Sequence, residues 1–309
     1  MQSWPPTQGI RVSRPDGRVA RAARNVLDRR YRRPAPTGWL ASSALVVAPH
    51  PDDETLGCGG TIALRRASGA AVHVAFLTDG TLSHKGRLPA ADLAARRRRE
   101  ALDACTRLGV PSGAVHFLDY EDGHLAASRK VATGRLAELV DALRPAHVLV
   151  TSVHDGTPDH VAAAQIARAA ARLANHRPAL FEYPVWHWDR WPYSPWPGVV
   201  PSKRALREAA RFLSRSVAAW WLPARLSGAF SVDVSRVLVV KAQALDAHQT
   251  QMQRPQGDPA WPVLGEVNGG AFLENLMGDT ERFWPVRATT GRRAVAAMPG
   301  SYDGAVERE

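Results

Sequence analysis

The 309 residues exceed the length of a typical single domain, and one large α/β domain with an extension at each end accounts for them. Hydrophobic residues make up 45% of the chain and charged residues 22%, as in soluble proteins with a substantial core. The sequence has no stretch of eighteen apolar residues, which argues against a transmembrane segment, and its two cysteines argue against a disulfide scaffold. We therefore expect a cytoplasmic protein.

The formal net charge is +11, which is compatible with nucleic acid, an anionic membrane or an acidic substrate as a partner. Much of the positive charge lies in residues 1–33 and in the arginine run 96–99. Arginine usage by a GC-rich genome explains the same composition, so we expect no nucleic-acid partner. Residues 1–40 lack apolar periodicity and contain Pro34-Ala35-Pro36, which predicts a basic, loosely docked N-terminal extension.

The pattern becomes regular from about residue 41. Short apolar runs predict buried strands over 44–48, 72–77, 115–118 and 147–151. Helical periodicity predicts helices over 55–68, 91–108, 129–143 and 159–173. Strands that alternate with helices predict an α/β fold, a Rossmann-like three-layer sandwich with a mostly parallel sheet.

The pattern is less regular after Pro178. We predict a strand over 180–185, a Trp- and Pro-rich loop over 186–201, a strand over 230–234 and a helix over 236–248. The main domain is expected to span 41–288. The Gly-, Ala- and Arg-rich segment 289–309 is expected to be a disordered tail.

The segment Pro49-His50-Pro51-Asp52-Asp53-Glu54 directly follows the first predicted strand. Ligands of open parallel sheets bind beyond the carboxyl ends of the strands, where these side chains are expected. An imidazole and a carboxylate are ligands that zinc accepts. His50 and Asp53 can therefore share a metal if the chain bends at Pro51, which leaves Asp52 free to act on a water at that metal. Acidic residues also favour a helix N-terminus by themselves, but this does not account for His50.

A second polar cluster, 153–160, follows the fourth predicted strand and should reach the same edge of the sheet. A catalytic zinc needs three protein ligands and an open position, and His160 is our candidate for the third ligand. A rival interpretation is a dinucleotide site, because Gly57, Gly59 and Gly60 are followed by Asp79. These glycines fall inside the predicted helix, where they favour close packing of the helix on the sheet.

The two clusters resemble the motifs of the PIG-L/LmbE-like deacetylases. Further segments resemble this family in the same order, over about residues 42–286: 77–80, Arg97-x-x-Glu100, Asp122-Gly123, 182–186 and Lys241 to Gln251. The resemblance implies an LmbE-like fold. It also implies zinc, or another divalent metal such as Fe²⁺, on His50, Asp53 and His160, with Asp52 as the general base.

The resemblance further implies that Arg97, Asp122 and His248 bind substrate. Arg97 could equally belong to a solvated helix face, and His248 could be a structural histidine. The family usually has a histidine three residues before the last ligand, where this chain has Thr157. Either His154 takes over this catalytic role, or Asp52 moves the proton in both directions.

We therefore predict a zinc-dependent hydrolase that removes an acyl group, in the first place acetyl, from the nitrogen of an amino sugar, a glycolipid or another glycoconjugate. A family member that binds metal and carbohydrate but is catalytically weak or inactive is the alternative, because of Thr157. The Trp-rich loop could contact a sugar or a lipid, or could pack as a lid. A nucleic-acid-binding protein and an esterase or phosphatase with the same metal are further alternatives.

Overall fold

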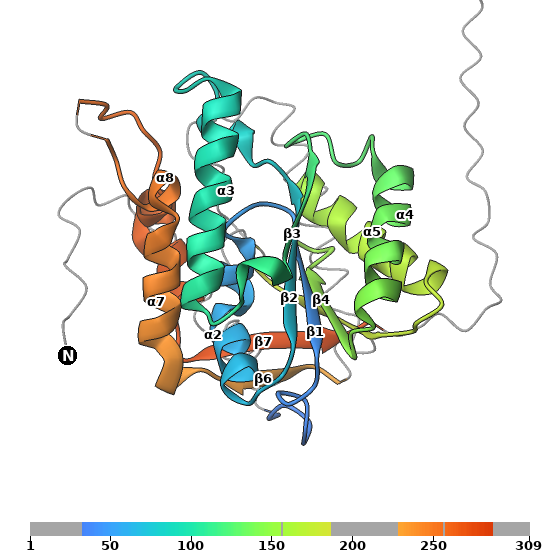
Figure 1. Cartoon of the computed structure of the whole chain (residues 1–309). Coiled ribbons are helices and arrows are strands. Elements are labelled where there is room, and N and C mark those ends of the chain that lie inside the picture. Colours follow the sequence, from blue (N-terminus) through green and yellow to red (C-terminus); the bar gives the residue numbers. More distant parts are fainter. Residues whose placement is uncertain (1–32, 156, 187–227, 256, 287–309) are drawn as a thin grey trace, which may run out of the picture.

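The computed structural model describes residues 33–155, 157–186, 228–255 and 257–286 (Figure 1). Its strands are β1 (Ala44–Ala48), β2 (Val72–Thr78), β3 (Val115–Tyr120), β4 (His147–Thr151), β5 (Ala179–Tyr183), β6 (Phe230–Asp233) and β7 (Thr280–Pro285). Its helices are α2 (Asp53–Ala67), α3 (Ala90–Arg107), α4 (Arg129–Leu143), α5 (Pro158–Leu173), α7 (Leu238–Ala247), α8 (Gln249–Met252) and α9 (Ala271–Leu276). The predicted α/β architecture is confirmed.

The strands form one seven-stranded sheet in the order β3-β2-β1-β4-β5-β7-β6. The first five are parallel, whereas β7 pairs antiparallel with both β5 and β6. The chain leaves β1 toward β2 and β3 and then returns to the other side of β1 as β4. The neighbouring strands β1 and β4 therefore form a topological switch point, and ligands of open α/β sheets bind at the carboxyl ends of such strands.

Helices cover both faces of the parallel strands, as Figure 1 shows: α2, α3 and α7 lie on one side and α4 and α5 on the other. All five residues of β1 are buried. Val46 and Ala48 belong to the core under α2 and α3, while Leu45 and Val47 belong to the core under α4 and α5. Burial on both faces explains why this strand is apolar throughout rather than alternating.

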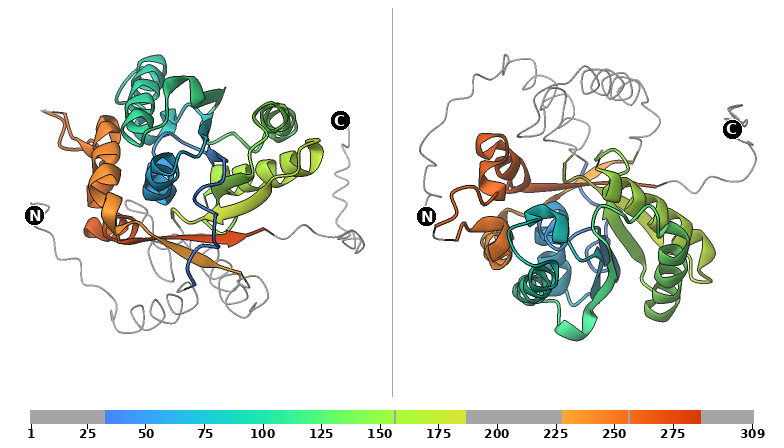
Figure 2. Two further views of the ribbon diagram at one scale, coloured as in Figure 1. Left: turned by 60° about the horizontal axis from the view of Figure 1, so that its bottom comes forward. Right: turned by 90° about the horizontal axis from the view of Figure 1, so that it is seen from above.

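Helix α2 lies close to the strands and to the β7–β6 pair (Figure 2). A Cβ atom on Gly57 would lie 2.2 Å from the Tyr183 ring, and one on Gly60 would lie 2.6 Å from Val234. These glycines thus permit the close packing that the sequence predicted. They lie within α2 and not in the turn after β1, so the rival dinucleotide fingerprint lacks its required turn.

The C-terminal half differs most from the expectations. β7 was not predicted. The predicted helix 236–248 consists of a 3₁₀ turn (Ser235–Val237) and α7, and α8 begins after His248, whose ψ of 60° interrupts the helical path. Residues 1–32, most of the predicted Trp-rich loop and the predicted tail lie outside the described residues. None of the helices that the structure describes is long and apolar enough to cross a membrane.

Candidate metal centre and active site

The loops after β1 and β4 meet at the carboxyl edge of the sheet, as the sequence predicted. The ring centroids of His50 and His160 are 5.4 Å apart. His50 Nδ1 lies 3.2 Å and His160 Nε2 lies 3.3 Å from the same atom, Asp53 Oδ2. Ligand atoms around a tetrahedral zinc lie about 3.3 Å apart, given zinc–ligand bonds of about 2.0–2.1 Å. His50, Asp53 and His160 therefore form a group that could hold a metal ion.

The second nitrogen of each imidazole faces another carboxylate. His160 Nδ1 lies 2.9 Å from Asp155 Oδ2. His50 Nε2 lies 3.1 Å from Asp122 Oδ1 and 3.4 Å from Asp159 Oδ2. Metal-binding histidines usually donate their other N–H to such an acceptor, which fixes the tautomer and the direction of the ring. His160 Nε2 is buried and has no hydrogen-bond partner in the part of the chain that the structure describes, as expected of a lone pair kept for a cation.

His50, Asp122 and Asp159 form a second group whose spacing could hold a metal. Their carboxylates are already occupied by the protein. Asp122 Oδ2 accepts the Leu82 N–H at 2.8 Å, and Asp159 Oδ2 accepts the Gly123 N–H at 2.7 Å. The group with His160 is the better ligand set, because it contains a buried nitrogen that accepts no hydrogen bond from any described residue.

The site carries a surplus of buried negative charge. Among the described residues, six carboxylates are buried there beside the guanidinium of Arg97: Asp52, Asp53, Glu54, Asp122, Asp155 and Asp159. Burial lowers the pKa of His160, but Asp53 and Asp155 outweigh it and raise that pKa to about 9. Burial would raise the pKa of Asp53, but the imidazoles of His160 and His50 outweigh this effect and hold that pKa well below its usual range. Such a site attracts positive charge, either protons or a divalent cation.

Asp52 lies at the N-terminus of α2 in a strained backbone conformation, with φ 134° and ψ −28°. Its N–H donates to Glu54 Oε2 at 3.0 Å, and its Oδ2 accepts from Arg97 Nη2 at 3.0 Å. Burial raises the pKa of Asp52 to about 6, although Arg97 opposes the shift. Strained residues of this kind persist only where surrounding contacts fix them, and they concentrate in functional sites.

Comparison with known proteins places this architecture in a family. The model of the PIG-L family, described as GlcNAc-PI de-N-acetylase, matches residues 45–171. A 1D-myo-inositol 2-acetamido-2-deoxy-alpha-D-glucopyranoside deacetylase from Rhodococcus jostii (strain RHA1) is 31% identical over 72% of this chain and 88% of its own length. A diacetylchitobiose deacetylase from Thermococcus kodakarensis is 34% identical over 75% of this chain and 81% of its own length.

The chain belongs to the PIG-L/LmbE-like family. A solved N,N'-diacetylchitobiose deacetylase from Pyrococcus horikoshii has the same fold, with a TM-score of 0.55 and 19% identity over 91% of this chain and 95% of that one. In this member of the PIG-L/LmbE-like family, the three residues that the resemblance nominated as substrate contacts face inward.

Arg97 and His248 are almost completely buried and contact the protein. Arg97 Nη1 donates to Gly80 O at 2.5 Å, and Nη2 donates to Pro51 O as well as to Asp52. His248 Nε2 lies 3.0 Å from Glu54 Oε1. The alternative that Arg97 belongs to a solvated helix face is wrong, because its side chain is only 2% exposed. Asp122 contacts His50, as described above.

The loop before α5 has Thr157 at the position where the family usually has a histidine. Thr157 precedes α5 at the N-cap position, yet its hydroxyl makes no capping bond, and Oγ1 is buried without a partner among the described residues. His154 is half-buried on the same loop, and its backbone N–H donates to Ser152 Oγ at 3.0 Å. Thr157 therefore offers an unused hydrogen-bond donor two residues before Asp159.

Sequence reasoning did not assign roles to Glu54, Asp155 or Asp159, although all three stand inside the two motifs. Asp155 also accepts the Val185 N–H, at 3.2 and 3.1 Å, and so connects His160 to the end of β5. The sequence shows these carboxylates beside the ligands. It does not show which of them reach a histidine, because that depends on how the loops fold together.

Proposed function

We propose that this chain is a metal-dependent amidohydrolase that removes an N-acyl group, in the first place acetyl, from an amino sugar or a glycoconjugate. The observation that carries the proposal is the buried His160 Nε2, which lies 3.3 Å from Asp53 Oδ2 and has no hydrogen-bond partner within residues 33–155, 157–186, 228–255 and 257–286. His50 completes this ligand set, and the strained Asp52 stands beside it. Deacetylase activity of the relatives supports the reaction class.

His50, Asp53 and His160 would hold the metal, and zinc suits this nitrogen and oxygen ligand set, with Fe²⁺ as the alternative. A divalent cation supplies Lewis acidity, which lowers the pKa of water and stabilises negative charge on an amide oxygen. Asp155 holds His160 in the tautomer that leaves Nε2 free, and Asp122 with Asp159 does the same for His50 Nδ1.

Asp52 is the general base of the proposed reaction. Its pKa of about 6 leaves it ionised near neutral pH while it remains basic enough to take a proton from water. Arg97 fixes one carboxylate oxygen, and Glu54 fixes the backbone N–H. His248 contacts Glu54, so it supports Asp52 through that carboxylate. These contacts favour a positioning role for Arg97, Asp122 and His248 over direct contact with substrate.

The departing amine needs a proton, which Asp52 can return or His154 can donate. The Thr157 hydroxyl cannot act as an acid near neutral pH, but it can donate a hydrogen bond to a developing oxyanion. A cytoplasmic enzyme with an amino-sugar substrate and no nucleic-acid partner stays our prediction.

The test is metal analysis of the purified chain together with amine release from a panel of N-acetylated sugars. Asp52→Asn should keep its metal and lose about 10²–10⁴-fold in kcat/KM, the range typical of a lost general base. Asp119→Asn, at an exposed carboxylate paired with Arg98, is the matched control and should keep full activity.

Equal activity of Asp52→Asn and the wild type would remove Asp52 from its role. Sugar binding by the wild-type, metal-loaded chain without any amine release would instead favour the catalytically inactive alternative. Turnover of carboxylic or phosphoric esters without turnover of the amides would point to a different hydrolase.

A further inference from the structure

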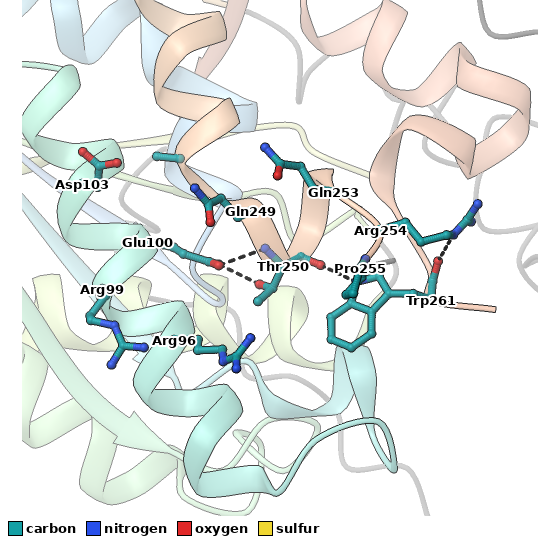
Figure 3. A pocket seen from close by; sticks show the side chains of 11 residues that line it. Arg96, Arg99, Glu100, Asp103, Gln249, Thr250, Gln253, Arg254, Pro255 and Trp261 are labelled. Carbon is teal, nitrogen blue, oxygen red and sulfur yellow. Dashed lines mark hydrogen bonds between the residues drawn. The ribbon is translucent and has the colours of Figure 1, made fainter. Parts of the chain in front are cut away.

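A cavity lies outside the metal centre, between α3 and the segment that contains α8 (Figure 3). Its volume is about 490 Å³, which is within the usual range of small-molecule sites. Figure 3 shows the α3 side chains of Arg96, Arg99 and Glu100 on one wall, opposite Gln249, Thr250 and Gln253.

The acidic side chains of this cavity are engaged with the protein. Glu100 accepts the Thr250 N–H at 2.9 Å and the Thr250 hydroxyl at 2.6 Å. Asp103 pairs with Arg107 through two bonds, of 3.2 and 2.7 Å. Both carboxylates therefore have partners other than Arg96 and Arg99, which lie on the same helix.

The arginines of the 96–107 segment divide into two groups. Arg97 binds Asp52, Arg98 pairs with Asp119 at 3.0 Å, and Arg107 pairs with Asp103. Arg96 and Arg99 line the cavity and have no hydrogen-bond or ion-pair partner among the residues that the structure describes. Residues three apart lie on one face of a helix, so both guanidinium groups border the same space.

The rest of the wall suits an organic ligand. Gln249 and Gln253 contribute carboxamide groups, and Trp261 contributes an indole whose N–H is already bound to Thr250 O at 2.9 Å. Arg254 is held by Glu266 at 2.6 Å and by Trp261 O at 3.1 Å, so it stiffens this wall. Two unpaired guanidinium groups beside neutral donors match a dianion, and guanidinium binds phosphate oxygens in a bidentate manner.

We infer that this cavity is a binding site for a small organic phosphate, with Arg96 and Arg99 holding the phosphate group and Trp261 bounding the organic part. The inference goes beyond the proposed deacetylation and does not depend on it. The elements α3 and α8, which line the cavity, also carry residues that are linked to Asp52 by hydrogen bonds. Gln251 of α8 donates to Ser83 Oγ at 3.2 Å, and the same oxygen accepts from Arg97 at 3.1 Å.

The test is isothermal titration of the full chain with inorganic phosphate, pyrophosphate and a hexose phosphate, in buffer free of other multivalent anions. Arg96→Gln/Arg99→Gln should weaken binding of the hexose phosphate about tenfold or more, since bonds to a charged group are removed. Arg98→Gln/Arg129→Gln is the matched control, because it removes the same charge from arginines that contact Asp119 and Gln165. Its affinity should stay within about twofold of wild type.

A titration of Asp53→Asn separates this cavity from the metal centre, because phosphate held by a metal would be lost in that variant and phosphate in the cavity would remain. Equal weakening in both arginine pairs would show general charge attraction and overturn the inference. Saturation by none of the three phosphates would overturn it as well.

Discussion

Two buried ionic clusters contact helix α2, and they differ in whether their polar atoms have partners. In the first, Lys241 Nζ donates to Leu56 O at 3.0 Å, to Leu276 O at 2.7 Å and to Glu281 Oε1 at 2.8 Å. Glu281 also accepts the N–H groups of Gly60 and Thr61, at 2.8 and 2.7 Å. Every donor of the lysine is used, and one positive charge meets one negative charge.

The second cluster, at the metal centre, is unbalanced by comparison. Six buried carboxylates lie beside one guanidinium, and His160 Nε2 has no hydrogen-bond partner among the described residues. The balanced pair satisfies amides near the irregular residue Cys58 of α2, whose φ of −148° departs from the helix. The comparison shows that a buried charge with complete partners stabilises the fold, whereas a buried cluster with a charge surplus and an unused lone pair marks a binding site.

The largest effect should follow from Asp53→Asn. This substitution changes the carboxylate whose Oδ2 lies 3.2 Å from His50 Nδ1 and 3.3 Å from His160 Nε2, so we expect loss of bound metal and of nearly all amidase activity. Elemental analysis and the amine-release assay measure both. Since Asp53 Oδ2 accepts the His50 N–H at 3.0 Å and the two imidazoles hold the pKa of Asp53 low, the apo variant should unfold at a lower temperature than the apo wild type. Retained metal at wild-type stoichiometry would contradict the assigned ligand set.

Lys241→Met should lower the free energy of unfolding and leave the metal content and activity of the folded molecules unchanged. Breaking a buried pair from one side costs about 3–5 kcal/mol of unfolding free energy, because Glu281 is left without its counter-charge. Lys241→Met/Glu281→Gln should recover part of that loss. Urea unfolding measures the difference, and metal content per folded molecule serves as the control. A loss below about 1 kcal/mol would mean that water or relaxation replaces the lysine.

Arg97→Gln should shift the pH dependence of activity. Arg97 lowers the pKa of Asp52 against the effect of burial, so its removal should raise that pKa, by about 1 unit or more. A protonated Asp52 cannot act as a base, and the acid limb of kcat/KM should move to higher pH. Arg97→Lys, which keeps the charge, should move it less. An unchanged acid limb with a lower plateau would indicate a purely structural role.

The smallest effects on kcat should come from substitutions of Thr157 and His154, which test the roles of these two residues separately. Thr157→Val removes the unused hydroxyl but keeps the shape, and we expect kcat to fall several-fold, up to about tenfold, with little change in KM. His154→Ala should lower kcat more if His154 protonates the amine, and it should then flatten the alkaline limb of the pH profile. Wild-type kinetics in His154→Ala would leave Asp52 as the group that returns the proton.

Much of the fold was predictable because its signals are local. β1 and β4 are apolar runs, each followed by a polar motif, and the glycines of α2 stand where the helix packs on Tyr183 and Val234. The ligand group was predictable for a topological reason, since parallel strands bring their carboxyl ends to one edge. β7 was not, because its polar and aromatic residues become a strand only through pairing with β5 and β6.

By itself, the sequence determined the alternation of strands and helices and the two motifs, and therefore the meeting of His50, Asp53 and His160. Only the tertiary structure decided the partners of the buried charges: Arg97 with Asp52, His248 with Glu54 and Lys241 with Glu281. The physical reason is that a buried ion needs a counter-charge or several hydrogen bonds, and in these pairs the counter-charge lies far along the chain. Local patterns show that a charged residue is present, whereas packing decides whether it faces water, a partner or a ligand.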